Sequence, residues 1–229
     1  MQTATIPPSP EAARPGGENE LQQRLNKEVT SAFTALVAAT SRSAETVFDH
    51  LLEFILSGFT VGGHGLPEWP YDKEQTGRFT EMFRLIASSL GRILETRPWY
   101  DFFGVLYEFQ VAGRMRKSVT GQFFTPMNVC DLMAALTQDT DKTIYDPCCG
   151  SGRMLLAGWS MNRRAAVLGQ DLDRTCCLMT ACNLLLHGCT GTVRQGNSLL
   201  PDDVREEWAV NPYFSRMPVP HIIKTKTQS

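Results

Sequence analysis

The chain has 229 residues, of which 42% are hydrophobic and 20% are charged, and its formal net charge is −2. At roughly 150 residues per domain, this length predicts one or two domains with a real core. The near-neutral charge excludes a generally basic, histone-like binder, because sequence-independent affinity for nucleic acid requires clustered positive charge. No apolar stretch reaches the roughly 18 residues of a membrane span, and residues 1–15 lack the apolar core of a secretory signal. We therefore expect a cytoplasmic protein.

The cysteines also favour a reducing compartment. They number seven and include the adjacent pairs 148–149 and 176–177. A disulfide framework is unusual in a chain of this length, so reduced thiols are expected. No pair shows the C-x-x-C spacing that lets two thiolates converge on one zinc ion. We expect no metal site, and cysteines that act as small buried hydrophobic residues.

The first half of the chain is predicted to be helical. Residues 1–20 are rich in Pro, Gly, Ala and Glu without an apolar period, which indicates a disordered leader. From Leu21 to about Ser57, apolar residues recur at steps of three and four, as in amphipathic helices. A loop follows over 58–71, then a helix that ends before Pro98 and another over about 99–116. Residues 21–117 are thus expected to form a helical N-terminal domain.

The second half alternates short apolar runs with helical stretches. Helices are predicted over 127–136, 153–162 and 174–187, and strands over 143–145, 165–169, 192–195 and 208–210. Strand–turn–helix repeats indicate a parallel sheet with right-handed crossovers, so residues 118–214 are expected to form a doubly wound α/β domain. The predicted strand order is 3-2-1-4, with the fourth strand at an open edge. Exposed edges are usually covered, so we expect a second copy or another polypeptide there, and a flexible tail over 215–229.

A glycine-rich turn, Asp146-Pro-Cys-Cys-Gly-Ser-Gly152, lies between the first strand and the next helix. Glycines permit positive φ and let a ligand approach the backbone, and doubly wound sheets bind nucleotides at this end of the first strand. The turn has neither G-x-G-x-x-G spacing nor a Walker lysine, so a phosphate fits poorly. Asp146 suits a cationic ligand such as the ammonium and sulfonium of S-adenosylmethionine. The alternative is a turn that uses glycine only for packing.

A second acidic residue, Asp171, follows the next strand, 25 residues after Asp146. A carboxylate at this position typically accepts hydrogen bonds from ribose hydroxyls. The alternative is an N-cap for the helix that begins at Arg174, a role that Asp173 could equally fill.

The segments GQFFTP, DPCCGSGRML, GQDLD, CNLLLHG, GNSL and NPYF occur in this order. With them, residues 100–214 resemble the N6-adenine DNA methyltransferases, and most of all the modification (methylase) subunits of type I restriction systems. The resemblance implies a Rossmann-like, S-adenosylmethionine-dependent methyltransferase fold, truncated at its C-terminal side and preceded by an α-helical region. It also implies S-adenosylmethionine as cofactor and DNA as substrate.

The resemblance assigns roles to individual residues. The FTP turn would cover the methionine part of the cofactor, the glycine-rich turn would hold its amino-acid end, and Asp171 would hold its ribose. Asn197 would face the cofactor's adenine, where the family usually has Asp; an Asn can still accept through its carbonyl oxygen. The residues implied at the cofactor are Phe124, Thr125, Pro126, Asp146, Cys148, Gly150, Gly152, Asp171 and Asn197.

The tetrapeptide Asn211-Pro212-Tyr213-Phe214 lies where the family has its catalytic N-P-P-aromatic motif. The Asn211 side-chain oxygen and the Pro212 carbonyl would align the exocyclic amine of a flipped adenine, and Phe214 would stack on that base. Tyr213 replaces the second proline of the motif. A proline at this position would fix φ and would lack an N–H donor.

Three functions therefore stay open. The first is an N6-adenine DNA methyltransferase. The second is a cofactor-binding but weak or inactive relative that regulates or assembles with a complete modification complex. The third is a DNA- or protein-interaction module that keeps only the fold.

Overall fold

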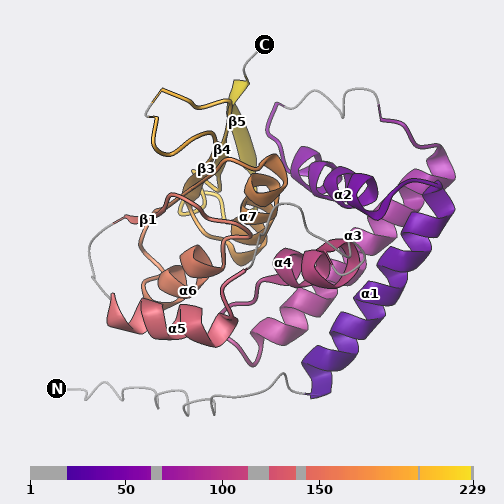
Figure 1. Ribbon diagram of the computed structural model, residues 1–229, viewed down its shortest axis with the longest axis horizontal. Helices are drawn as coiled ribbons and strands as arrows, with labels where there is room; N and C mark the ends of the chain where they lie inside the picture. Colours follow the sequence, from indigo (N-terminus) through magenta and orange to yellow (C-terminus); the bar gives the residue numbers. More distant parts are fainter. Residues whose placement is uncertain (1–19, 63–68, 113–123, 138–142, 201, 228–229) are drawn as a thin grey trace.

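The computed structural model describes residues 20–62, 69–112, 124–137, 143–200 and 202–227. It places a group of helices beside a mixed sheet that carries further helices (Figure 1). The leader predicted over 1–20 lies outside the described residues except for Glu20, which begins the first helix. Among the described helices, none is both long and apolar enough to cross a membrane.

The helical half contains α1 (Glu20–Thr40), α2 (Ala44–Gly58), α3 (Lys73–Leu94) and α4 (Phe102–Tyr107), which continues into the π-helix η1 (Glu108–Ala112). Local capping explains the boundaries that periodicity alone left undefined. The predicted helical run over 21–57 is broken at Ser41, whose φ is +53°, and Ser43 then caps α2 by accepting from the Thr46 N–H at 3.1 Å. The predicted helix over 99–116 begins later, because Asp101 is its N-cap.

The sheet contains β1 (Ile144–Asp146), β2 (Val167–Asp171), β3 (Gly191–Gln195), β4 (Glu206–Val210) and β5 (Ile222–Thr227), in the spatial order β1-β2-β3-β4-β5. The helix α5 (Met127–Leu136) precedes it, and α6 (Arg153–Met161) and α7 (Arg174–His187) connect the first three strands. These three strands are parallel, as predicted.

The predicted strand order 3-2-1-4 is wrong. β4 pairs antiparallel with β3 at the far side from β1. Residues 196–205 connect the two strands and hold no helix among those described. A parallel return needs a crossover of about a dozen or more residues, usually helical, so the shorter connection turns β4 back antiparallel.

The flexible tail predicted over 215–229 is wrong for residues 222–227, which form β5; residues 228–229 lie outside the described residues. β5 pairs antiparallel with β4, and Ile222 at its start is fully buried. The Ile222 N–H donates to the Phe59 carbonyl at 2.8 Å, which ties the strand to the end of α2. The segment is rich in Ile and Thr, residues that fit a half-buried sheet. β4 is therefore an internal strand rather than the open edge expected from the sequence.

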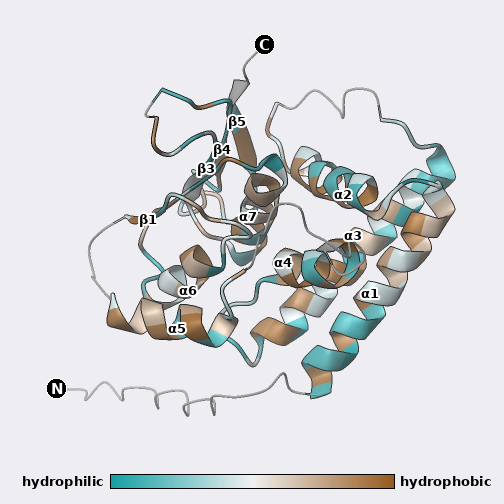
Figure 2. Cartoon of the chain, in the orientation of Figure 1, coloured by the Kyte–Doolittle hydropathy of each residue, from teal (hydrophilic) through white to brown (hydrophobic). Residues whose placement is uncertain are grey.

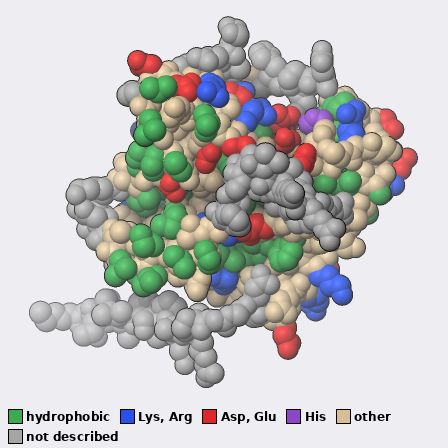
Figure 3. Space-filling model, viewed as in Figure 1, with side chains coloured by type: hydrophobic (Ala, Val, Ile, Leu, Met, Phe, Trp, Pro, Cys, Tyr) green, Lys and Arg blue, Asp and Glu red, His purple; other side chains and the backbone are tan. Residues whose placement is uncertain are grey.

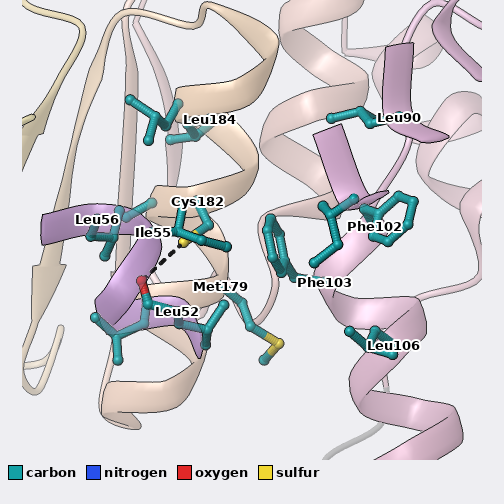
Figure 4. Packing of buried hydrophobic residues seen from close by; sticks show 14 of the residues in the cluster. Leu52, Ile55, Leu56, Leu90, Phe102, Phe103, Leu106, Met179, Cys182 and Leu184 are labelled. Carbon is teal, nitrogen blue, oxygen red and sulfur yellow. Dashed lines mark hydrogen bonds between the residues drawn. The ribbon is translucent and has the colours of Figure 1, made fainter. Parts of the chain in front are cut away.

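The core extends through both the helices and the sheet. Apolar residues gather on the inward faces of the helices (Figure 2), and α7 is buried over nearly its whole circumference. A helix that is apolar all round belongs inside a protein, and α7 contacts both α2 and α4. Figure 4 shows this contact, where Leu52, Ile55 and Leu56 of α2 and Phe103 of α4 lie near Met179, Cys182 and Leu184 of α7.

Candidate functional site

The parallel strands bring the two predicted carboxylates to one edge of the sheet. Asp146 ends β1 and Asp171 ends β2, and the register aligns Asp146 with Gly169 and Asp171 with Gln195. Asn197 follows β3 at the same edge, where the Gly196 N–H donates to the Asp171 carbonyl at 2.9 Å. The carboxyl ends of β1, β2 and β3 thus gather three of the residues that the sequence nominated.

Both carboxylates contact the backbone of the glycine-rich turn. Asp146 Oδ1 accepts from the Cys148 N–H at 3.0 Å, and Asp171 Oδ2 accepts from the Gly150 N–H at 2.9 Å. Gly150 and Gly152 have φ of +54° and +88°, which side-chain-bearing residues rarely adopt. The turn therefore requires glycine for its backbone conformation and not only for packing.

The FTP segment lies against this turn. A Cβ placed on Gly150 would lie 3.1 Å from the ring of Phe124, so the ring and the turn are in close approach. Phe124 is half-buried, whereas Thr125 and Pro126 are exposed. Pro126 is the N-cap residue of α5. The structure thus brings Phe124 to the turn that the resemblance pairs with it.

Hydrogen bonds distinguish the roles of Asp171 and Asp173. Asp173 is the N-cap of α7 and accepts from the Cys176 N–H at 2.9 Å. Asp171 does not cap the helix; its Oδ1 accepts from the Asp173 N–H at 2.9 Å. The capping alternative for Asp171 is therefore excluded, and each Asp171 oxygen keeps lone-pair capacity for a ligand.

Asn197 is held by its own loop. Its N–H donates to Asp203 Oδ2 at 3.0 Å, and its side-chain oxygen accepts from the Leu199 N–H at 3.0 Å. The side-chain oxygen, the acceptor expected to read an amine, is therefore already bonded within the loop.

The charges at this edge favour a cation. Burial raises the pKa of Asp146, and the nearby charge of Asp171 raises this pKa further. A cation bound beside Asp146 would stabilise the ionised carboxylate and oppose both effects.

A cavity of about 500 Å³ opens beside β1 and meets the candidate site only at Asp146. Its volume is in the range of small-molecule pockets, but neither Asp171 nor Asn197 lines it. The lining comes from α5, β1 and α6, including Ala134, Ile144, Tyr145, Asp146, Met154 and Gly158.

The structure does not bring the NPYF residues to this edge. β4 runs antiparallel, so its end at Val210 lies beside Gly191, the start of β3. Asn211 is fully buried there. Its side chain donates to the carbonyls of Leu185 (3.3 Å) and Cys189 (3.0 Å) and accepts from the His221 N–H at 2.9 Å.

The rest of the tetrapeptide stays with Asn211. Pro212 and Phe214 are half-buried, and the Phe214 ring lies 3.0 Å from where a Cβ on Gly188 would be. The Tyr213 N–H donates to His221 Nε2 at 3.2 Å, a bond that the family's proline could not make. In this arrangement, the two acceptors expected to act on adenine lie at the opposite end of the sheet from Asp146 and Asp171.

Sequence reasoning missed a buried polar network next to the glycine-rich turn. Asp101 is fully buried and accepts from the Gly104 N–H, Ser151 Oγ, Asn183 Nδ2 and Arg153 Nε. One signal was present in the sequence, because Arg153 stands at the first position of α6. A cation at a helix N-terminus is unfavourable, and this predicts a nearby acidic partner. Elsewhere among the described residues, no group of three metal-ligating side chains converges.

Comparison with known proteins gives a consistent set of relatives. A family model described as N-6 DNA Methylase matches residues 99–223, more than half of the chain. The chain is 28% identical over 132 residues to the type I restriction enzyme MjaIX methylase subunit of Methanocaldococcus jannaschii, a match that covers 50% of this chain and 23% of that protein. It is 31% identical over 97 residues to the MpnII methylase subunit of Mycoplasma pneumoniae, covering 38% and 18%. The chain thus spans less than a quarter of these relatives' length.

A solved structure shares the fold. It is described as a class I S-adenosylmethionine-dependent methyltransferase from Listeria monocytogenes. The superposition has a TM-score of 0.51 at 16% identity and covers 80% of this chain and 55% of that one. This likeness confirms the fold class expected from the sequence.

Proposed function

Because the chain belongs to the N-6 DNA methylase family, we propose that it binds S-adenosylmethionine and transfers a methyl group to the exocyclic amine of adenine in DNA. The observation that supports this most is the pair of carboxylates, Asp146 and Asp171, which flank a left-handed glycine turn at the carboxyl ends of adjacent parallel strands. Doubly wound sheets bind their ligands at this place. The bound cofactor would supply an electrophilic methyl group on a sulfonium.

The proposal gives a role to each candidate residue near the turn. Asp146 compensates the positive charge of the ligand, and the backbone of Gly150 to Gly152, against which the Phe124 ring packs closely, holds its amino-acid end. Asp171 accepts from the ribose hydroxyls with the lone pairs that the turn does not use. Phe124, Thr125 and Pro126 cover the methionine part, and Cys148 and Asn197 line the rim.

A second candidate function is favoured by the position of Asn211. In the catalytic role, the Asn211 oxygen and the Pro212 carbonyl would have to face the exocyclic amine of the flipped adenine, yet the side chain of Asn211 is buried and its oxygen accepts from the His221 N–H. A protein that binds the cofactor but transfers the methyl group slowly, and that assembles with a complete modification complex, would have this arrangement.

Two measurements test the proposal. Calorimetry with S-adenosylmethionine is expected to give saturable one-site binding that weakens as the pH falls toward the raised pKa of Asp146, because the protonated carboxyl no longer attracts a cation. Transfer of tritiated methyl from the cofactor to unmethylated DNA, with N6-methyladenine as the product, distinguishes the two candidates. Binding without transfer favours the second candidate, and absence of binding rejects both.

We further propose that the chain works with DNA and within a restriction–modification assembly, and that a second copy or a partner subunit covers one surface. β1 is an edge strand of the described sheet. Beside it, α5 exposes apolar residues at steps of three and four, among them Leu132 and Leu136, which are 57% and 72% exposed. Figure 3 shows hydrophobic side chains (green) gathered at the lower left, where Figure 1 places α5. Such patches often mark interfaces.

Light scattering at micromolar concentration tests the second copy. A dimer is expected if the chain covers its own α5 and β1 surface. A strict monomer would contradict self-association and leave a partner subunit as the occupant.

A further inference from the structure

One buried guanidinium joins the two segments that form the candidate cofactor site. Arg153 follows Gly152 directly, and its side chain is only 7% exposed. Its Nη1 donates to the Thr125 carbonyl at 3.1 Å, and its guanidinium carbon lies 5.2 Å from the centre of the Phe124 ring. The residue at the end of the glycine-rich turn therefore contacts the FTP segment through both a hydrogen bond and a cation–π interaction.

Two carboxylates hold this guanidinium from the other side. Arg153 Nε donates to Asp101 Oδ2, and Nη2 donates to Glu108 Oε2 at 2.6 Å. Asp101 is the N-cap residue of α4, and Glu108 begins the π-helix η1. π-Helical turns are often found at functional sites, and here the turn begins at the residue that binds the arginine.

The inner carboxylate has little freedom to move. Asp101 also accepts from the Gly104 N–H at 2.8 Å, Ser151 Oγ at 2.5 Å and Asn183 Nδ2 at 2.7 Å. Ser151 belongs to the glycine-rich turn, so Asp101 fixes the turn directly as well as through Arg153. A Cβ on Gly104 would lie only 2.0 Å from Asp101 Oδ2, and the helix therefore leaves space for this carboxylate.

The outer carboxylate is more accessible. The Glu108 side chain is 41% exposed. Its removal would leave Arg153 compensated by Asp101, which makes Glu108 the gentler position for a test. The planar guanidinium of Arg153 presents several N–H donors in fixed directions, and it can therefore bind Asp101, Glu108 and the Thr125 carbonyl at once. A lysine ammonium could not reproduce this arrangement.

We propose that Arg153 is a positioning residue for cofactor binding: held by Asp101 and Glu108, it keeps the Phe124–Pro126 segment closed over the Gly150–Gly152 turn. The proposal rests on the proposed function, in which these two segments surround the methionine end of S-adenosylmethionine. It assigns Arg153 no contact with the cofactor itself. The effect of Arg153 on affinity is therefore confined to ligands that carry the amino-acid end of S-adenosylmethionine.

The test compares two ligands on the full chain. S-adenosylmethionine carries the methionine end, whereas 5′-methylthioadenosine keeps the adenosine part and lacks the amino acid. Glu108→Gln and Arg153→Lys are each expected to weaken S-adenosylmethionine binding by about tenfold and to leave 5′-methylthioadenosine binding within about twofold, because each change removes charged hydrogen bonds that hold only the Phe124–Pro126 segment. Glu74→Gln, which removes the carboxylate of an exposed ion pair with Arg78 on α3, is the matched control.

The outcomes separate the two proposals. If the unaltered chain takes up no S-adenosylmethionine, the proposed function fails. If it does, and the variants lose both ligands equally or neither, the positioning role is overturned while the proposed function stands. Thermal unfolding identifies a general loss of structure: Glu108→Gln is expected to melt with the unaltered chain, so a selective loss of affinity in this variant cannot come from misfolding.

Discussion

Asp171→Asn is expected to weaken binding of S-adenosylmethionine by about 100-fold, equivalent to about 2.7 kcal/mol. Both oxygens of Asp171 accept from backbone N–H groups, those of Gly150 and Asp173. An amide can accept at only one of these positions, so the other N–H would face an NH₂ group and the turn would shift. The ribose hydroxyls would also lose a charged acceptor, and such hydrogen bonds contribute roughly 1.5–3 kcal/mol each. Calorimetry measures the change.

Asp173→Asn is the matched control, because it makes the same chemical change two residues away. Asp173 caps α7 by accepting from the Cys176 N–H, and asparagine is about as good an N-cap as aspartate. Affinity in this variant is expected to stay close to that of the unaltered chain. Equal losses in the two variants would show that net charge, rather than the geometry at Asp171, governs binding.

Asn211→Ala is expected to lower the free energy of unfolding by about 3 kcal/mol. The change removes the side-chain partner of the Cys189 carbonyl and of the His221 N–H, whereas the Leu185 carbonyl still accepts from the Gly188 N–H. A buried polar group left unsatisfied costs about 1–3 kcal/mol. Asn211 also has φ of +50°, a conformation that costs alanine about 1–2 kcal/mol but that asparagine adopts more readily. Urea unfolding measures the loss.

Asn211→Gly separates the two causes, because glycine adopts positive φ without strain. It is expected to lose the hydrogen bonds but to recover part of the stability. If Asn211→Ala unfolds at the same urea concentration as the unaltered chain, Asn211 is not the buried anchor described above. The result also matters for any activity assay, because a loss of methyl transfer in this variant would otherwise be misread as loss of a catalytic group.

Local patterns predicted the helices of the second half well. The bounds expected for Met127–Leu136 and Arg174–His187 agree with α5 and α7. Each has a clear local signal: Pro126 precedes the first, and Gly188, with φ of +71°, ends the second. The glycine-rich turn was predicted for the same reason, since its conformation depends on residues close together in the chain.

The errors concern partners that are distant in sequence or topology. The placement of β4 depends on which edge of the sheet its short connection can reach, and β5 is stabilised by pairing with β4 and by Phe59. Asp101 and Ser151 are 50 residues apart, and Asp101 and Asn183 are 82 apart. No local period or motif links such positions, so the network around Arg153 emerged only from the folded chain.

Six of the seven cysteines are buried, and Cys148 is the exposed one. Burial raises the pKa of all six others, of Cys130 to about 11 and of the rest further, so they react slowly with alkylating reagents. A maleimide dye would consequently attach at one position without any prior mutagenesis. The Cys148 N–H donates to Asp146, so the fluorescence of the attached dye would change as ligand binds at the glycine-rich turn.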